Sequence, residues 1–129
     1  MIAVDTNVVI RLLTKDDPQQ FKKAFTLFKE NRVFLSFTVI QETEWVLRFS
    51  YEFSSDEINF ALSGLLGLPN IETENLQIIS NTLSLHADGY DFSDALHLAQ
   101  SIKCDFLFTF DKKFVNKAKD NPICQVKKP

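Results

Sequence analysis

The chain has 129 residues, which fits one domain and leaves no room for a second domain of ordinary size. Apolar residues make up 45% of it and thirteen residues are Phe, so a core can form and a disordered chain is excluded. No apolar run is long enough to cross a bilayer, glycine-rich phosphate loops are absent, and the net charge of −3 argues superficially against a nucleic-acid partner.

Strands alternate with helices in the first half of the predicted structure. Pro18 stands at an early helical position, and apolar residues on one face follow it, so it marks the second helix. Thr38 is the expected cap of the next long helix. The β-branched run 8–10 follows turn-forming residues, so a hairpin there remains an alternative to the first helix. The predicted elements are a strand at 1–4, a short helix ending at 13, a helix at 16–31, a strand at 32–37, and helices at 38–53 and 54–66.

The second half continues this alternation. Its strands are short and apolar, and they show no strict alternation of apolar and polar residues. This pattern indicates an α/β fold with a small, mainly parallel sheet flanked by helices. The predicted elements are a strand at 70–73, helices at 74–88 and 91–103, a strand at 105–110, a helix at 111–119 and a strand at 123–126.

The two cysteines indicate a reducing environment. Cys104 and Cys124 lie next to predicted strands, and we interpret both as small core residues with reduced thiols. The N-terminal stretch lacks the basic head and apolar run of a signal peptide, because Asp5 interrupts it. We therefore expect a cytoplasmic protein.

Acidic residues follow several of the predicted strands. Asp5 comes directly after the first strand, Asp111 follows a later strand, and Glu42 lies one turn into the helix after the second strand. Asp91 and Asp94 stand one turn apart at the head of a helix. Because sites in an open parallel sheet form at the carboxyl ends of the strands, we expect these acids to converge on one edge.

Most of these acids also have a purely structural interpretation. Asp5 and Asp111 can cap the helices that follow them, although Thr6 can cap as well. Asp91, with Asp94 three residues later, fits a capping box about as well as it fits a metal site. One cap is an ordinary feature, but four or five acids that converge on one edge need another explanation.

Converging carboxylates repel one another, and their pKa values rise unless a cation lies among them. A hard divalent ion held by oxygen ligands and water, Mg²⁺ or Mn²⁺, is the stable solution. Such ions activate water and neutralise charge on a leaving oxygen, so the acids predict phosphoryl chemistry with one or two ions per site. The sequence offers no Ser-His-Asp or Cys-His set for a covalent alternative.

Four segments carry a resemblance to a known family, namely VDTNVVIRLL, TVIQETEWVL, DFSDALHLA and TFDKKF. In this order and spacing they resemble the PIN-domain ribonucleases, and among these the VapC-type toxins of bacterial toxin–antitoxin pairs. The resemblance runs from Met1 to about Phe114 and implies a single PIN domain over residues 1–129. It further implies a PIN-like three-layer sandwich and a Mg²⁺-dependent endoribonuclease that hydrolyses RNA phosphodiester bonds.

The resemblance also assigns roles to individual residues. The acids that match its catalytic motifs are Asp5, Glu42, Asp94 and Asp111. The metal ligands that it implies are Asp5, Asp94, Asp111 and, as an additional acid, Asp91. The polar groups that orient these carboxylates match Thr6, Asn7 and Thr109. Glu42 is implied either as a ligand or as the base that orients water, and the products would carry a 5′-phosphate and a 3′-hydroxyl.

The C-terminal region is basic although the whole chain is acidic. From Lys112 to the end there are six lysines against one acid. A solvated lysine-rich helix face explains them as well as RNA binding does. The candidates for holding the RNA backbone are Lys112, Lys113, Lys117 and Lys119, with Arg11 as a weaker one.

The helix predicted after Thr38 carries two acids and, with the next helix, surplus aromatic residues. Glu42 interrupts its apolar stripe, whereas Glu44, four residues before Arg48, predicts a solvated ion pair. The aromatic residues predict an interface, which the family resemblance implies to be a homodimer and a groove for an antitoxin segment, with a higher assembly as an extension. They are Trp45, Phe49, Tyr51, Phe53 and Phe60.

Two rival interpretations remain from the sequence. A phosphatase or phosphotransfer domain also places an Asp nucleophile in an acidic pocket with a supporting Lys, and Lys112 beside Asp111 keeps this alternative open. A PIN-like module that binds RNA or a protein without cleaving is the other rival. The presence of all four motif acids argues against it, because a degenerate site needs none of them.

Overall fold

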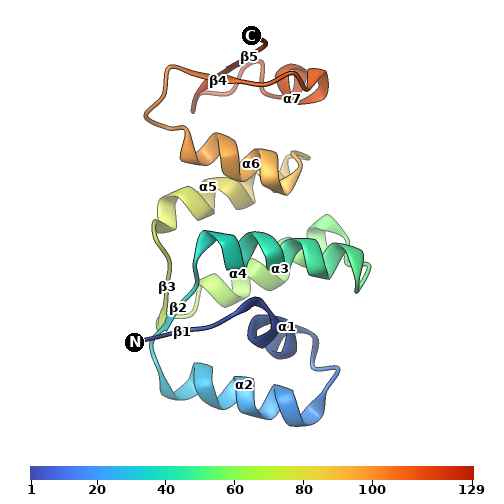
Figure 1. Cartoon of the computed structure of the whole chain (residues 1–129), viewed down its shortest axis with the longest axis vertical. Coiled ribbons are helices and arrows are strands. Elements are labelled where there is room, and N and C mark those ends of the chain that lie inside the picture. The colour runs from blue at the N-terminus through green and yellow to red at the C-terminus, as the bar shows by residue number, and fades with distance from the viewer. The chain divides into compact units, whose positions relative to one another are not determined.

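The computed structural model describes all 129 residues, which form two compact units, residues 1–76 and 77–129 (Figure 1). The elements of the first unit are β1 (Ile2–Ala3), α1 (Thr6–Thr14), α2 (Pro18–Glu30), β2 (Val33–Phe34), α3 (Phe37–Phe49), α4 (Ser55–Leu66) and β3 (Ile71–Glu72). Those of the second unit are α5 (Leu76–Ala87), which begins at the boundary, α6 (Phe92–Gln100), β4 (Phe106–Phe108), α7 (Lys112–Lys117) and β5 (Gln125–Lys127).

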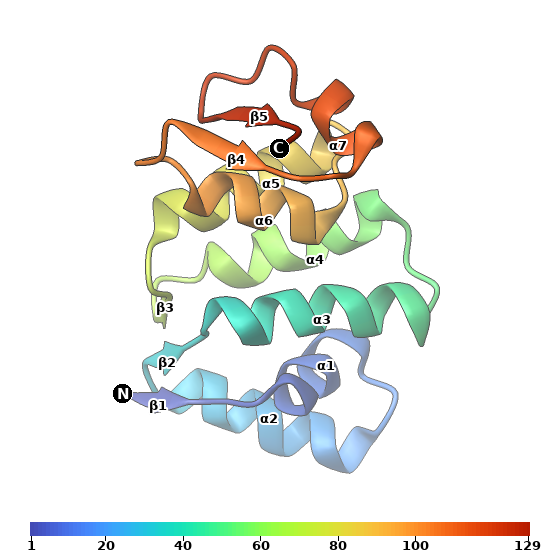
Figure 2. The same cartoon turned by 45° about the horizontal axis from the view of Figure 1, so that its top comes forward.

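The first unit is built on a three-stranded parallel sheet. Its order is β1-β2-β3, with Ile2 opposite Val33 and Val33 opposite Ile71. Helix α1 lies between α2 and α3, and α4 packs against α3 (Figures 1 and 2). Val9 and Ile10 form the buried face of α1, so the hairpin alternative for this segment is wrong. The chain thus leaves the carboxyl end of β1 through Asp5 and turns directly into a buried helix.

Capping residues set where the helices of the first unit begin. Pro18 occupies the first turn of α2, as the sequence predicts. The cap of α3 is Ser36 rather than Thr38, because the chain is already helical at Phe37 and the Ser36 hydroxyl accepts the Val39 N–H at 3.2 Å. This helix ends at Phe49, four residues earlier than predicted.

A left-handed residue explains the early end of α3. Glu52 has a φ of 56°, which interrupts a right-handed helix. The Phe53 N–H then returns to the Leu47 carbonyl at 3.0 Å. The next helix starts cleanly at Ser55, because Ser54 and Glu57 form a capping box.

Helix α3 buries a carboxylate. Glu44 is 2% exposed, so the prediction of a solvated pair is wrong. Ile40, Thr43, Glu44 and Leu47 share one helical face, and that whole face is buried. Arg48 Nε donates to Glu44 Oε2 at 2.8 Å and Nη2 donates to Oε1 at 3.3 Å, which compensates the buried charge.

The second unit contains a two-stranded parallel sheet. β4 pairs with β5, Phe106 lying opposite Gln125, and α7 follows the carboxyl end of β4 (Figure 2). Its core consists of Leu98, Phe114, Ala118, Cys124 and Val126. Both cysteines are free thiols, as predicted.

The two cysteines differ in burial. Cys124 belongs to the core, and burial raises the pKa of its thiol. Cys104 is exposed in the turn between α6 and β4, where its N–H donates to the Ser101 carbonyl at 2.9 Å, so the core interpretation is wrong for it.

The fold class agrees with the prediction. The protein is α/β, every strand pair is parallel, and all twelve predicted helices and strands are present. The strands are shorter than predicted, and they form two sheets, one in each unit. None of the helices has both the length and the apolar character that a membrane span requires.

Candidate functional site

Asp5 and Glu42 line one cavity in the first unit. This cavity has a volume of about 350 Å³ and is formed by residues of α1, by α3 and by the segment that follows α3. Asp5 caps α1, and its Oδ1 accepts the Thr6 N–H at 2.7 Å. Glu42 is exposed on α3. Asn7 lines the same cavity, so four of the predicted site residues, Asp5, Thr6, Asn7 and Glu42, lie around one hollow.

Thr6 contributes an unpaired hydroxyl to this cavity. The residue is 6% exposed, and its Oγ1 has no hydrogen-bond partner in the protein. A buried hydroxyl without a partner is destabilising, and such groups are uncommon in folded proteins. An oxygen donor of this kind, beside the Asp5 and Glu42 carboxylates, has the chemistry that a hydrated Mg²⁺ requires.

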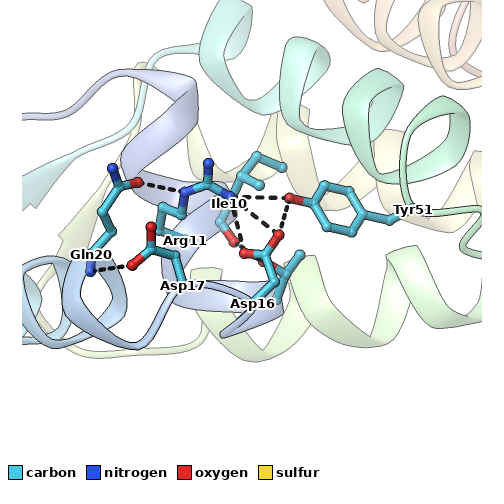
Figure 3. Close-up of polar contacts among 7 residues, drawn as sticks. Ile10, Arg11, Asp16, Asp17, Gln20 and Tyr51 are labelled. Atoms are coloured by element: carbon cyan, nitrogen blue, oxygen red, sulfur yellow. Dashed lines mark hydrogen bonds and ion pairs between the residues drawn. The ribbon is translucent and has the colours of Figure 1, made fainter.

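Arg11 donates its hydrogen bonds to side chains of the first unit. Its Nη1 donates to Asp16 Oδ1 at 3.0 Å and to the Tyr51 hydroxyl at 3.2 Å, and its Nε donates to Gln20 at 2.6 Å (Figure 3). The Tyr51 hydroxyl in turn donates to Asp16, which lowers the pKa of that carboxyl, with Thr14 and Arg11 contributing further. Arg11 lines the Asp5 cavity, but most of its donors are already used.

Three acids line a second cavity, in the second unit. Asp91, Asp94 and Asp111 surround a hollow of about 510 Å³ together with Lys113 and Lys117. Two helix starts bring them there. Asp91 and Asp94 lie at the beginning of α6, and Asp111 lies at the beginning of α7, after β4. We call this hollow the acidic cavity.

Hydrogen bonds fix two of these acids. Asp91 caps α6, with Oδ2 accepting the Asp94 N–H at 3.2 Å, so the capping interpretation is confirmed. Asp111 caps α7, with Oδ1 accepting the N–H groups of Lys113 and Phe114. The Thr109 hydroxyl accepts the Asp111 backbone N–H at 3.1 Å, so Thr109 contacts the backbone of Asp111 rather than its carboxylate. Each cap leaves one carboxylate oxygen without a backbone donor, and that oxygen remains available to a cation.

Asp94 makes no such capping bond, and its surroundings disfavour its charge. Burial, followed by the nearby Asp91 and Asp111 carboxylates, raises the pKa of Asp94, and His97 opposes this shift. The electrostatic arrangement is therefore one that a bound cation would relieve. Carboxylate oxygens are the ligands that hard divalent ions such as Mg²⁺ take in proteins. No group of three or more His, Cys, Asp and Glu side chains is by itself arranged to hold a metal ion.

The predicted basic residues differ in position. Lys113 and Lys117, on α7, line the acidic cavity. Lys112, on the same helix, lines neither this cavity nor a neighbouring cavity of about 610 Å³ in the second unit. Lys119 lies just beyond the helix and lines the neighbouring cavity. Two lysines beside three carboxylates can bind a phosphate once the carboxylate charge is neutralised.

Three residues that line the acidic cavity were not predicted from the sequence, Gly89, Tyr90 and Phe114. Gly89 has a φ of +99°, which an L side chain rarely adopts. A Cβ at this position would lie 3.2 Å from Lys117 Nζ. A glycine two residues after the end of α5 and just before the acidic motif is the local signal from which a special backbone could have been predicted.

An α/β fold with parallel strands and two carboxylate cavities, one of them lined by lysines as well, is suited to chemistry on phosphate esters. The sequence matches the PIN domain family over residues 2–120. The chain belongs to the PIN domain family, whose members are generally nucleases.

Among solved structures, the chain is similar to VapBC2 from Rickettsia felis bound to a DNA fragment from their promoter. The identity is 17% and the TM-score is 0.40, with 100% of this chain and 99% of that chain covered. No curated protein matches the chain.

Proposed function

We propose that this protein is a metal-dependent endoribonuclease that acts as the toxin of a toxin–antitoxin pair. The observation that carries the proposal is the acidic cavity, in which three carboxylates and two lysines meet in a chain of the PIN domain family. Burial, followed by the neighbouring carboxylates, raises the pKa of Asp94, and a divalent cation would offset both effects. The lysines are suited to the phosphodiester that such a cation would polarise.

The residues that would hold Mg²⁺ or Mn²⁺ are Asp94, Asp111 and Asp91 of the second unit and Asp5 of the first. When bound, the ion would activate water and neutralise charge on the leaving oxygen. The family match spans residues 2–120 and so includes the candidate acids of each unit. One or two ions per site are compatible with this number of oxygen donors.

The protein's own groups position the substrate. Lys113 and Lys117 bind the phosphate beside the acids, and Thr109 holds Asp111 in place through its backbone. Glu42, exposed at the edge of the Asp5 cavity, accepts a hydrogen bond from the attacking water and orients it. In-line attack then leaves a 5′-phosphate and a 3′-hydroxyl.

Exposed aromatic residues support the proposed protein partners. The rings of Trp45 and Phe49 contact each other at a tilt of 43°, with centroids 5.0 Å apart, and both side chains are more than half exposed. Phe60, on the adjacent helix α4, is 84% exposed. Apolar surface of this kind is suited to a homodimer contact and to a cognate antitoxin segment, both of which belong to the proposed toxin role.

The proposal is tested by RNA cleavage. The purified chain is incubated with total cellular RNA in Mg²⁺, in Mn²⁺ and in EDTA, beside Asp5→Asn and Asp94→Asn. We expect metal-dependent cuts with 5′-phosphate ends, and a loss on the order of 100-fold in each variant, because a charged ligand is replaced by a neutral one of similar shape.

Asp56→Asn is the matched control, since Asp56 is an exposed acid in the first turn of α4 and lines neither acidic site. It should cleave like the wild type. Equal cleavage by wild type, Asp5→Asn and Asp94→Asn would refute the assigned site. A phosphorylated Asp5 trapped from a phosphate donor would instead favour the phosphotransfer rival.

A further inference from the structure

Within the second unit, another cavity adjoins the acidic cavity and shares two lining residues with it, Tyr90 and Lys117. Its volume is about 610 Å³, and it is distinguished by three asparagines, Asn81, Asn116 and Asn121. We call it the asparagine cavity. Its remaining lining residues are Ser84, Leu85, Asp88, Tyr90, Lys117, Lys119, Asp120, Pro122 and Ile123.

Tyr90 and Lys117 join the two cavities, because both residues line each of them. The Tyr90 hydroxyl donates to the Lys117 carbonyl at 3.0 Å, and Lys117 Nζ lies 5.6 Å from the centre of the Tyr90 ring. Gly89 leaves space for the ammonium, since a Cβ there would approach it to 3.2 Å. A molecule held at the acids can therefore extend past Lys117 into the asparagine cavity.

Asn121 brings an unpaired buried donor to this cavity. Its Oδ1 accepts the Ile123 N–H at 2.7 Å, which fixes the orientation of the amide. Its Nδ2 is buried and makes no hydrogen bond of normal geometry, although the Tyr90 hydroxyl lies close to it. A buried donor without an acceptor is destabilising in the free protein, and it is explained when a ligand supplies the acceptor.

The charges of the asparagine cavity indicate what kind of ligand it takes. Lys117 and Lys119 are balanced by Asp88 and Asp120, so the lining is formally neutral. A neutral lining with side-chain amides, a hydroxyl and an aromatic ring is poorly suited to a phosphate. It is well suited to a nucleobase, whose edge offers hydrogen-bond acceptors and whose face offers apolar contact.

We propose that the asparagine cavity binds the nucleobase of the nucleotide next to the cleaved phosphate, with Asn121 Nδ2 donating to an acceptor on the base edge. Lys117 then contacts the phosphate between the base and the acids. This inference rests on the proposed nuclease function and adds to it a base preference at one position beside the cut. A donor aimed at one edge favours bases that present an acceptor there and disfavours the others.

The first test measures binding with the full chain carrying Asp94→Asn, which prevents cleavage. Hexaribonucleotides of A, C, G and U are titrated in Mg²⁺ by fluorescence anisotropy. We expect one base to bind best, and Asn121→Asp to weaken that base by about ten-fold, because a donor becomes an acceptor in a buried place. This substitution keeps the oxygen that the Ile123 N–H needs.

A second variant obstructs the cavity without changing its polar groups. Ser84→Trp places a large side chain at an exposed position that lines the asparagine cavity. Ser80→Trp, one turn earlier on α5, is the matched control, since Ser80 is exposed and does not line it. Ser84→Trp should remove the base ranking, and Ser80→Trp should retain it. Gln100→Glu, on the exposed end of α6, controls for the added charge of Asn121→Asp.

The outcomes separate the inference from the proposed function. Cleavage by the wild type with no base preference beside the cut, or equal binding by Ser84→Trp and Ser80→Trp, overturns the inference and leaves the nuclease function standing. Base-selective binding that Ser84→Trp removes, in a chain that cleaves no RNA, refutes the nuclease and overturns the position beside a cut, although the asparagine cavity then still binds a base. Absence of binding to all four oligonucleotides overturns the inference.

Discussion

Asp94 is the residue at which the opposing demands of folding and function are clearest. It begins a helix, where a negative charge is normally favourable. Burial and the carboxylates of Asp91 and Asp111 nevertheless raise the pKa of Asp94, so the unfavourable interactions exceed the favourable one. The ionised side chain therefore destabilises the folded protein at neutral pH, and it stabilises the folded state only when a cation is bound.

The raised pKa of Asp94 predicts a pH-dependent effect of Asp94→Asn on stability in EDTA. The raised pKa means that ionised Asp94 is destabilising above that pKa, and that the destabilisation disappears as the pH falls through it toward the ordinary 3.8. Asp94→Asn should therefore have a higher unfolding temperature than the wild type at pH 7, and the difference should shrink on acidification. Thermal scans across pH measure this, and a lower unfolding temperature at pH 7 would contradict it.

Adding Mg²⁺ to the same thermal scans tests whether Asp94 binds the metal ion. Mg²⁺ should raise the unfolding temperature of the wild type and leave that of Asp94→Asn nearly unchanged, because a ligand that binds only the folded state stabilises it. EDTA should reverse the rise. An equal rise in both proteins would mean that Mg²⁺ binds elsewhere.

At the scale of the element, single side chains decide the ends of helices more than average propensity does. Ser36 caps α3 because its hydroxyl reaches the Val39 N–H, although Thr38 has a similar side chain two residues later. The left-handed backbone conformation of Glu52 prevents the same helix from continuing. Sequence patterns predict that such a helix exists, but not which of two adjacent hydroxyls takes the cap.

The cap assignment predicts a difference between two neighbouring alanine variants. Ser36→Ala should lower the free energy of unfolding by about 1 kcal/mol, because the Val39 N–H loses its acceptor. Thr38→Ala should lower it by only a few tenths of a kcal/mol, since Thr38 is exposed inside the first turn. Urea denaturation gives both values. Equal losses would show that the two hydroxyls share the cap.

At the scale of the whole molecule, the sequence predicts the order and type of the elements well, because apolar spacing and turn residues are local signals. It does not predict that Glu44 is buried, since that depends on which helical face packs inward. The asparagine cavity could not be predicted from the sequence either. Its lining combines residues of α5 with residues near position 120, and no local pattern connects them. Asp5, Asp91, Asp94 and Asp111 were identifiable because they stand at helix starts, and Glu42 because it interrupts an apolar stripe. The electrostatic coupling among Asp91, Asp94 and Asp111 depends instead on how the starts of α6 and α7 pack together.

The exposed aromatic residues give a prediction about assembly. Phe60→Glu should shift the purified chain toward the monomer in light scattering, because a charge replaces the most exposed aromatic ring on α4. Ser63→Glu adds the same charge at an exposed polar position of that helix and should leave the mass unchanged. A wild type that is monomeric at all concentrations would refute the homodimer.

The acidic cavity has a consequence for selection. Each of its carboxylates can be neutralised by one substitution, and at Asp94 such a change relieves repulsion in the metal-free protein. A laboratory screen that rewards heat resistance alone would therefore collect amide or apolar replacements there early. Under the proposed function, the selected variants would be stable but unable to cleave RNA. Thermostable variants should therefore be selected with activity measured in every round.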